Sequence, residues 1–182
     1  MKGIVFNLLE QAVNDEYGAQ AWDAILTAAD VDGVYTAVGS YDDEQLMRIV
    51  GAASTALETE PDVLVRWFGG RALPLLNTRY PHFFAAHDNA RDFILTLNAV
   101  IHPEVRKLFP GADVPEFAYD TSDPDVLLLS YVSNRGLCAL AEGLIDGAAA
   151  HFGEKVTIVQ RECTKHGDAR CLFACTFSAA ES

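Results

Sequence analysis

Four side chains in this sequence have the types and spacing for binding chemistry. Tyr131, Ser133 and Arg135 stand two residues apart in Tyr-Val-Ser-Asn-Arg, and His102 ends the apolar stretch Phe-Ile-Leu-Thr-Leu-Asn-Ala-Val-Ile. Two hydroxyls and a guanidinium can together hold the carboxylates of a planar acidic ligand. An imidazole at the end of an apolar stretch can bind a metal through its neutral ring nitrogen.

The spacing of the first three residues matters because side chains alternate faces along a strand. If residues 126–135 form a strand, Tyr131, Ser133 and Arg135 point the same way. The planar donor fork of arginine matches a carboxylate, and the hydroxyls add uncharged donors around the same oxygens. The spacing therefore predicts an anion clamp. A hydrogen-bonded sheet face with a surface arginine would show the same pattern, and spacing alone favours that simpler interpretation.

His102 is followed by Pro103, and proline disfavours helical geometry at the residue before it. The pattern predicts a long helix from Asp88 that ends in a bend at His102, with Pro103 starting a short helix through Leu108. A single histidine in an apolar segment is more often a hydrogen-bonded core residue than a ligand. No metal is assigned to the histidines near other helix ends, His82, His87 and His151.

Apolar periodicity predicts a helical N-terminal part. In this part helices are expected over residues 17–29, 42–57 and 61–68, and a further helix is expected over residues 137–148, after Arg135. Asp42 with Gln45 three residues later is typical of a capping box, and Pro61 suits the first turn of a helix. The pair Gly69-Gly70 predicts a break after that helix.

Alternating residues near the C-terminus predict an antiparallel hairpin. Its strands are expected over residues 155–161 and 170–177, joined at Gly167-Asp168. The fold class is therefore α+β, in one domain over residues 1–182. A helical N-terminal lobe over about residues 1–65 packs on a C-terminal lobe over about residues 66–182, which carries the antiparallel sheet and further helices.

Composition and charge exclude several classes of function. Half of the 182 residues are apolar and the net charge is −13. Nucleic-acid binding needs a basic surface that replaces phosphate counterions, so neither a nucleic acid nor an anionic membrane is expected as a partner. No apolar run approaches the roughly 20 residues of a spanning helix. The N-terminus lacks the apolar core of a signal peptide, which predicts a cytoplasmic protein.

The chain resembles the heme-nitric oxide/oxygen binding (H-NOX) family from Met1 to about Phe177. The resemblance is carried by Met-Lys-Gly-Ile-Val at the start, Ile-His-Pro-Glu-Val around His102, the following Pro115, and Tyr-x-Ser-x-Arg. It implies a heme between the two lobes, with His102 as the proximal iron ligand. It also implies that Tyr131, Ser133 and Arg135 hold the heme propionates. The heme would be b-type, because the Cys-x-x-Cys-His attachment pattern is absent.

The resemblance also indicates which gas is bound. Oxygen binders of the family supply a distal tyrosine hydroxyl five residues after the clamp arginine, and here that residue is Leu140. Bound dioxygen gains from a hydrogen-bond donor, whereas nitric oxide binds strongly without one. We therefore expect binding of nitric oxide, and of carbon monoxide, with exclusion of oxygen. The other distal residues expected are Val5, Leu9, Leu76 and Leu144, all apolar.

The implied mechanism is a conformational switch. Nitric oxide is expected to break the bond between His102 and iron, and Pro115 is expected to press on the heme and keep it nonplanar until that bond goes. The helical lobe would then shift against the lobe that carries Arg135. The resemblance implies a separate histidine kinase or cyclic-di-nucleotide enzyme as the partner that receives the signal.

Cysteines near the C-terminus form a second group of candidate ligands. A zinc site is possible from Cys138, Cys163, His166, Cys171 and Cys175. Some bacterial members of the family carry zinc there with a histidine three residues before the first hairpin cysteine, and here that residue is Gln160, a poor zinc ligand. Buried free thiols are an equal alternative, and a redox-sensing pair is a third.

Two rival functions remain open from the sequence. One is a heme-free small-molecule or zinc/redox-responsive regulatory domain, because related modules share a hairpin with this cysteine and glycine pattern. The other is a heme enzyme. The sequence offers no distal acid-base pair of the kind that peroxide chemistry uses, so a non-enzymatic role is expected.

Overall fold

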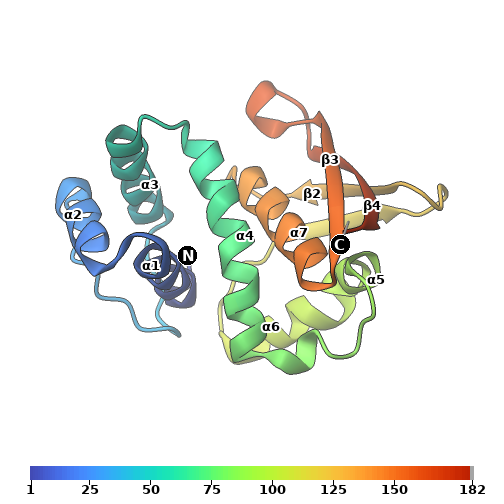
Figure 1. The fold of residues 1–182 in the computed structure, drawn as a ribbon, viewed down its shortest axis with the longest axis horizontal. Helices are drawn as coiled ribbons and strands as arrows, with labels where there is room; N and C mark the ends of the chain where they lie inside the picture. Colours follow the sequence, from blue (N-terminus) through green and yellow to red (C-terminus); the bar gives the residue numbers. More distant parts are fainter. Residues whose placement is uncertain (181–182) are drawn as a thin grey trace.

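The computed structural model describes residues 1–180, and its mixture of helices with an antiparallel sheet confirms the α+β fold class (Figure 1). The helices are α1 (Gly3–Tyr17), α2 (Ala19–Ala29), α3 (Asp43–Leu57), α4 (Pro61–Arg79), α5 (Ala90–Leu95), α6 (His102–Leu108) and α7 (Cys138–His151). Shorter turns are the 3-10 turns η1 (Pro81–Phe83) and η3 (Thr164–His166) and the π-helical turn η2 (Leu97–Ile101). The strands are β1 (Glu116–Asp120), β2 (Leu127–Val132), β3 (Glu154–Glu162) and β4 (Cys171–Ala179).

The sheet is antiparallel throughout, in the order β1-β2-β4-β3. The register pairs Tyr131 with Cys171 and Leu129 with Phe173 across β2 and β4, so these four side chains share one face. All four are buried, and this face belongs to the same apolar core as α7. Exposed and partly buried residues alternate along β3, as expected for a strand of the predicted hairpin.

The described residues form two apolar cores. One core joins α1, α2 and α3, which stand together at the left of Figure 1. The other lies between α5, α7 and the sheet. Helix α4 contributes to both: Val65 and Phe68 belong to the first core and Leu73 belongs to the second. The boundary predicted near residue 65 therefore falls inside a continuous helix.

The break predicted at Gly69-Gly70 is wrong, because α4 runs uninterrupted from Pro61 to Arg79. The glycines serve close packing instead. A Cβ atom on Gly69 would lie 2.6 Å from the carbonyl oxygen of Leu140, and one on Gly143 would lie 2.0 Å from that of Arg66. The α4 and α7 backbones thus approach more closely than any larger residue allows.

Other local predictions also need correction. The capping box is not formed, because the Asp42 side chain makes no cap hydrogen bond and the Gln45 side chain accepts one from Tyr35. The strand predicted over residues 126–135 ends at Val132, and residues 134 and 135 lie in a turn. Helix α1 and strand β1 were not predicted, although β1 alternates in burial as Glu-Phe-Ala-Tyr-Asp.

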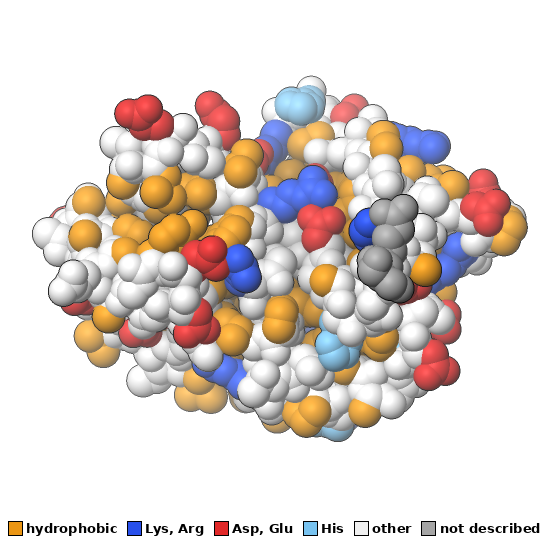
Figure 2. Space-filling model, in the orientation of Figure 1, with side chains coloured by type: hydrophobic (Ala, Val, Ile, Leu, Met, Phe, Trp, Pro, Cys, Tyr) orange, Lys and Arg blue, Asp and Glu red, His pale blue; other side chains and the backbone are white. Residues whose placement is uncertain are grey.

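The surface carries scattered charge with apolar atoms between (Figure 2). On the face shown, orange side-chain atoms gather at the left, over the N-terminal helices, with acidic groups around them. Helix α3 in this lobe exposes Met47 and Leu57. Among residues 1–180, no helix combines the length and the apolarity that crossing a bilayer requires.

Candidate functional site

A largely apolar pocket of about 440 Å³ lies between the two lobes. Its wall is built from α1, α4, α6, α7, β2 and the loop that precedes β1. This volume falls within the roughly 300–1,000 Å³ usual for small-molecule sites. Four of its polar lining residues are the ones singled out by their spacing, namely His102, Tyr131, Ser133 and Arg135.

His102 offers a neutral imidazole to this pocket. Burial, with a smaller effect of the Arg106 charge, lowers its pKa to about 4, so the ring carries no charge near neutral pH. Its Nδ1 atom is buried and has no hydrogen-bond partner among residues 1–180. The ring stacks on Phe117 of β1, with centroids 5.7 Å apart and planes at 28°. A neutral, apolar-walled imidazole is a suitable metal ligand.

The bend predicted at His102 is wrong. His102 has helical dihedral angles, φ −64° and ψ −38°, and it begins α6 directly before Pro103. The irregularity lies one turn earlier, in η2, where the Ile101 amide donates to the Thr96 carbonyl at 3.2 Å in a π-helical bond. A wider turn gives the proline ring room beside the preceding carbonyls, so the chain stays helical through the histidine.

The three clamp residues line the pocket together, but they do not all lie on one strand as predicted. Tyr131 is in β2 and 5 % exposed, whereas Ser133 and Arg135 follow the strand in the turn before α7. The Arg135 amide donates to Ser133 Oγ at 3.3 Å, which fixes this turn. Burial raises the pKa of the Tyr131 phenol, so it remains a hydrogen-bond donor at neutral pH.

The Arg135 guanidinium also contacts two acidic residues that the sequence did not reveal. Its Nε donates to Asp43 Oδ2 at 2.7 Å, and Nη2 lies 3.3 Å from Asp113 Oδ2. Asp43 begins α3, and it also accepts from the Met1 amine at 2.5 Å. Burial would raise the pKa of Asp43, but hydrogen bonds from the Met1 amine and Arg135 together outweigh it and hold the pKa below its usual value.

Most of the predicted apolar contacts lie on the pocket wall. The lining includes Val5, Leu76, Pro115, Leu140 and Leu144. Leu9 is not among the lining residues, whereas its neighbour Leu8 is, and both side chains belong to the N-terminal core. Successive residues of α1 are rotated by about 100° around the helix axis, so a shift of one position changes the face on which a side chain lies. Tyr80, at the end of α4, is a lining residue that the sequence analysis missed.

The structure brings together part of the predicted zinc ligand set. Cys138, Cys163 and Cys171 have their ligand atoms within 4.8 Å of one another, while Cys175 and His166 are outside this group. Cys175 is buried four residues farther along β4, and His166 is exposed in η3. None of the four thiols lines the pocket.

The pocket residues suit a heme. An apolar cavity accepts the macrocycle, the buried His102 can ligate iron, and Tyr131, Ser133 and Arg135 offer donors to carboxylates in the same cavity. The unpartnered Nδ1 of His102 leaves this imidazole without the hydrogen-bonded acceptor that usually strengthens a metal-bound histidine.

Comparison with known proteins agrees with this geometry. The Haem-NO-binding family model matches residues 2–160. An H-NOX protein from S. oneidensis, solved in the Fe(II)NO ligation state, is 31 % identical with a TM-score of 0.91, over 98 % of this chain and 99 % of that one. The H-NOX protein from Shewanella woodyi, in the Fe(II)CO state, is 32 % identical with a TM-score of 0.83, over 100 % of this chain and 97 % of that one.

A more distant structure shares the fold. The Fe(II) unliganded H-NOX protein from K. algicida has a TM-score of 0.88 at 24 % identity, over 100 % of this chain and 99 % of that one. The match to the family model covers most of the sequence, and its ends enclose His102 and the clamp. The chain belongs to the Haem-NO-binding, or H-NOX, family of heme-based gas sensors.

Proposed function

We propose that this chain senses nitric oxide at a ferrous b-type heme, excludes oxygen, and passes a conformational signal to a separate effector protein. The main support for the proposal is that one pocket is lined both by His102 and by the donors Tyr131, Ser133 and Arg135. The relatives in the Fe(II)NO and Fe(II)CO states support both gases as ligands. The effector would be a histidine kinase or a cyclic-di-nucleotide enzyme.

The chain's own residues would position the cofactor. When bound, heme supplies a ferrous iron with one coordination position open to a gas. His102 would ligate that iron through Nε2, because its Nδ1 is enclosed by protein. Tyr131, Ser133 and Arg135 would bind the propionates, and Arg135 would then share its donors between a propionate and Asp43.

Selectivity would follow from the apolar wall. Leu140 and Leu144 of α7, Val5 of α1 and Leu76 of α4 line the pocket without a hydrogen-bond donor. Dioxygen gains from such a donor and nitric oxide does not need one, so this wall favours nitric oxide. Tyr80, which directly follows α4, brings a phenol hydroxyl to the pocket lining, so its replacement by phenylalanine is the necessary control.

Signal transmission would begin at His102. Nothing among residues 1–180 holds its Nδ1, so His102 would be a comparatively weak iron ligand that nitric oxide binding would displace. The π-helical turn before it gives α6 a place to adjust. Pro115 on the same wall would press on the bound cofactor until His102 leaves. The helical lobe, tied to the clamp through Asp43 and Arg135, would then shift.

Absorption spectroscopy of the ferrous protein tests the proposal directly. Samples under nitric oxide, carbon monoxide and air are compared with His102→Gly and Tyr80→Phe variants. Complexes with nitric oxide and carbon monoxide but none with oxygen are expected in the wild type and in Tyr80→Phe. A protein that retains no heme when heme is plentiful would favour the heme-free regulatory role, and a stable oxygen complex would refute the selectivity.

A further inference from the structure

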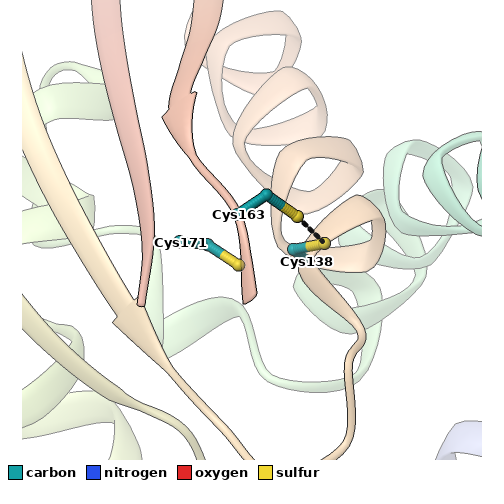
Figure 3. A group of neighbouring side chains, drawn as sticks. All are labelled: Cys138, Cys163 and Cys171. Carbon is teal, nitrogen blue, oxygen red and sulfur yellow. Dashed lines mark hydrogen bonds between the residues drawn. The ribbon is translucent and has the colours of Figure 1, made fainter. Parts of the chain in front are cut away.

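Three buried thiols outside the pocket lie close enough to share one metal ion (Figure 3). The Sγ atoms of Cys138, Cys163 and Cys171 are within 4.8 Å of one another, and those of Cys138 and Cys163 are 3.9 Å apart. Three sulfurs around one ion, at a metal–sulfur distance of about 2.3 Å, lie roughly 4 Å from each other. The three cysteines are at most 5 % exposed, so they are shielded from water.

Three separate elements hold these thiols in place. Cys138 begins α7, Cys163 follows β3 and Cys171 begins β4, and Figure 3 shows their sulfurs turned toward one another. The Cys163 amide donates to Asp168 Oδ2 at 2.7 Å, and the Cys163 carbonyl accepts from the Asp168 amide at 3.2 Å. These bonds fix the backbone of the loop that begins at Cys163.

Two neighbouring groups offer partial compensation for negative charge on these sulfurs, against the larger effect of burial. The Thr164 amide donates to Cys171 Sγ at 3.5 Å, and hydrogen bonds to sulfur stabilise metal-bound thiolates. The Lys165 ammonium lowers the pKa of Cys138, although burial is the larger effect and raises that pKa to about 12. Without an ion the Cys138 thiol is therefore protonated, and an ion must displace its proton to bind.

Gln160 lies on the same sheet face as part of this thiol group. Gln160 pairs with Phe173 across β3 and β4, which places it on the same sheet face as Cys171, two residues away. Its Nε2 atom is buried and has no hydrogen-bond partner among the described residues. A carboxamide oxygen is a hard donor and suits soft metal ions poorly, so this residue completes no tetrahedral sulfur and nitrogen site.

We propose that Cys138, Cys163 and Cys171 form a three-thiolate site for a soft d10 cation of the cuprous type, and that Gln160 disfavours zinc. Structural zinc sites are almost always four-coordinate, with sulfur or nitrogen in each position. Cuprous ion accepts thiolate ligands and is satisfied by three of them. Each thiol that binds releases its proton, the metal keeps its charge, and no electron is transferred.

This site would influence the gas-binding pocket because the two are neighbours. Cys171 pairs directly with Tyr131 across β2 and β4, and Cys138 begins the helix that carries Leu140 and Leu144. A bound ion would therefore fix the start of α7 and the strand beside the clamp tyrosine.

The test is a metal competition on the heme-loaded protein, kept anaerobic and reduced. Cuprous ion is supplied from a coloured chelator of known affinity, zinc is titrated separately, and copper, zinc and iron are counted by elemental analysis. One copper per chain is expected, with heme iron and heme absorption unchanged. Because iron and heme absorption are read separately, failure of the heme proposal stays distinct from failure of this one.

Variants separate the site from general effects. Cys138→Ser or Cys171→Ser is expected to weaken cuprous binding on the order of 100-fold or more. Cys175→Ser is the matched control, because Cys175 is an equally buried thiol outside the group, and its variant should bind as the wild type does. Gln160→His should raise zinc affinity on the order of 100-fold and leave cuprous affinity unchanged.

Three outcomes would overturn the proposal. The first is no stoichiometric copper binding by the folded wild type. The second is equal loss of binding in Cys175→Ser. The third is zinc bound as tightly by the wild type as by Gln160→His, a comparison that holds even if a cysteine variant does not fold.

Discussion

The Arg135 guanidinium donates from Nε to the Asp43 carboxylate at 2.7 Å, and so connects the turn after β2 to the first residue of α3. These residues stand 92 positions apart in the sequence. The arginine lines the pocket and the aspartate belongs to the N-terminal lobe. Whatever binds Arg135 in the pocket therefore competes with, or adds to, a contact between the lobes.

Asp43→Asn should weaken this contact. Its side chain is 42 % exposed, so solvent screening limits the loss to about 1 kcal/mol of unfolding free energy at neutral pH. The folded-state pKa of Asp43 is lowered, so its contribution is present above the unfolded pKa and is lost as pH falls through the folded value. Urea unfolding of the heme-free protein at pH 7 and near pH 3 measures both effects.

Glu44→Gln is the matched control for that change. Glu44 is the next residue of α3 and is exposed. It should alter the unfolding free energy by less than about 0.5 kcal/mol. If Glu44→Gln and Asp43→Asn lose the same stability, with the same dependence on pH, the contact between Asp43 and Arg135 contributes nothing.

His102 should make the heme-free chain less stable in mild acid. Its pKa is about 4 in the folded protein, against about 6.5 for an unperturbed histidine. Between these values the unfolded chain binds more protons, so stability rises with pH over this interval, by roughly 3 kcal/mol at most. His102→Leu should remove that slope between pH 4 and pH 6.5 in unfolding measurements. An unchanged slope would show that other groups cause it.

Leu140→Tyr should give the pocket an oxygen-stabilising donor. A hydrogen bond of about 1 kcal/mol slows oxygen release by several-fold to roughly tenfold. Stopped-flow absorption of the ferrous protein mixed with oxygen measures this rate. Leu140→Phe adds the ring without the hydroxyl and should not bind oxygen. If both variants bind oxygen, the added ring, and not the hydroxyl, causes the binding.

Gly143→Ala should disturb the packing of α4 on α7. The added Cβ would lie 2.0 Å from the Arg66 carbonyl oxygen, so the helices must separate, at a cost of about 1–3 kcal/mol. Gly51→Ala in α3 meets nothing within 4 Å and should stabilise the protein by roughly 0.5–1 kcal/mol. Chemical denaturation compares the two. A Gly143→Ala protein as stable as Gly51→Ala would contradict the close approach.

Arg66 connects α4 to α7 through two ion pairs. Its guanidinium bonds to Glu142 and Asp146, each at 2.7 Å, and both acids lie on α7. The N-terminal lobe contacts α4 through fewer polar pairs, such as Glu16 with Arg71.

The sequence by itself determined the chemical groups and the fold class. Period-two and period-3.6 patterns reflect local backbone geometry, so the C-terminal hairpin and most helices could be predicted. The types and order of His102, Tyr131, Ser133 and Arg135 were sufficient for the family resemblance. These features depend on residue identity and short spacing, which a sequence records directly.

Only the tertiary structure decided how those groups are arranged. It put Leu8 rather than Leu9 on the pocket wall, joined Arg135 to Asp43, and gathered three thiols while leaving Cys175 outside. It also carried α4 through Gly69 and Gly70, because close contact with α7 stabilises a helix that glycine alone would break. Such contacts join residues far apart in the chain, and local patterns carry no information on them.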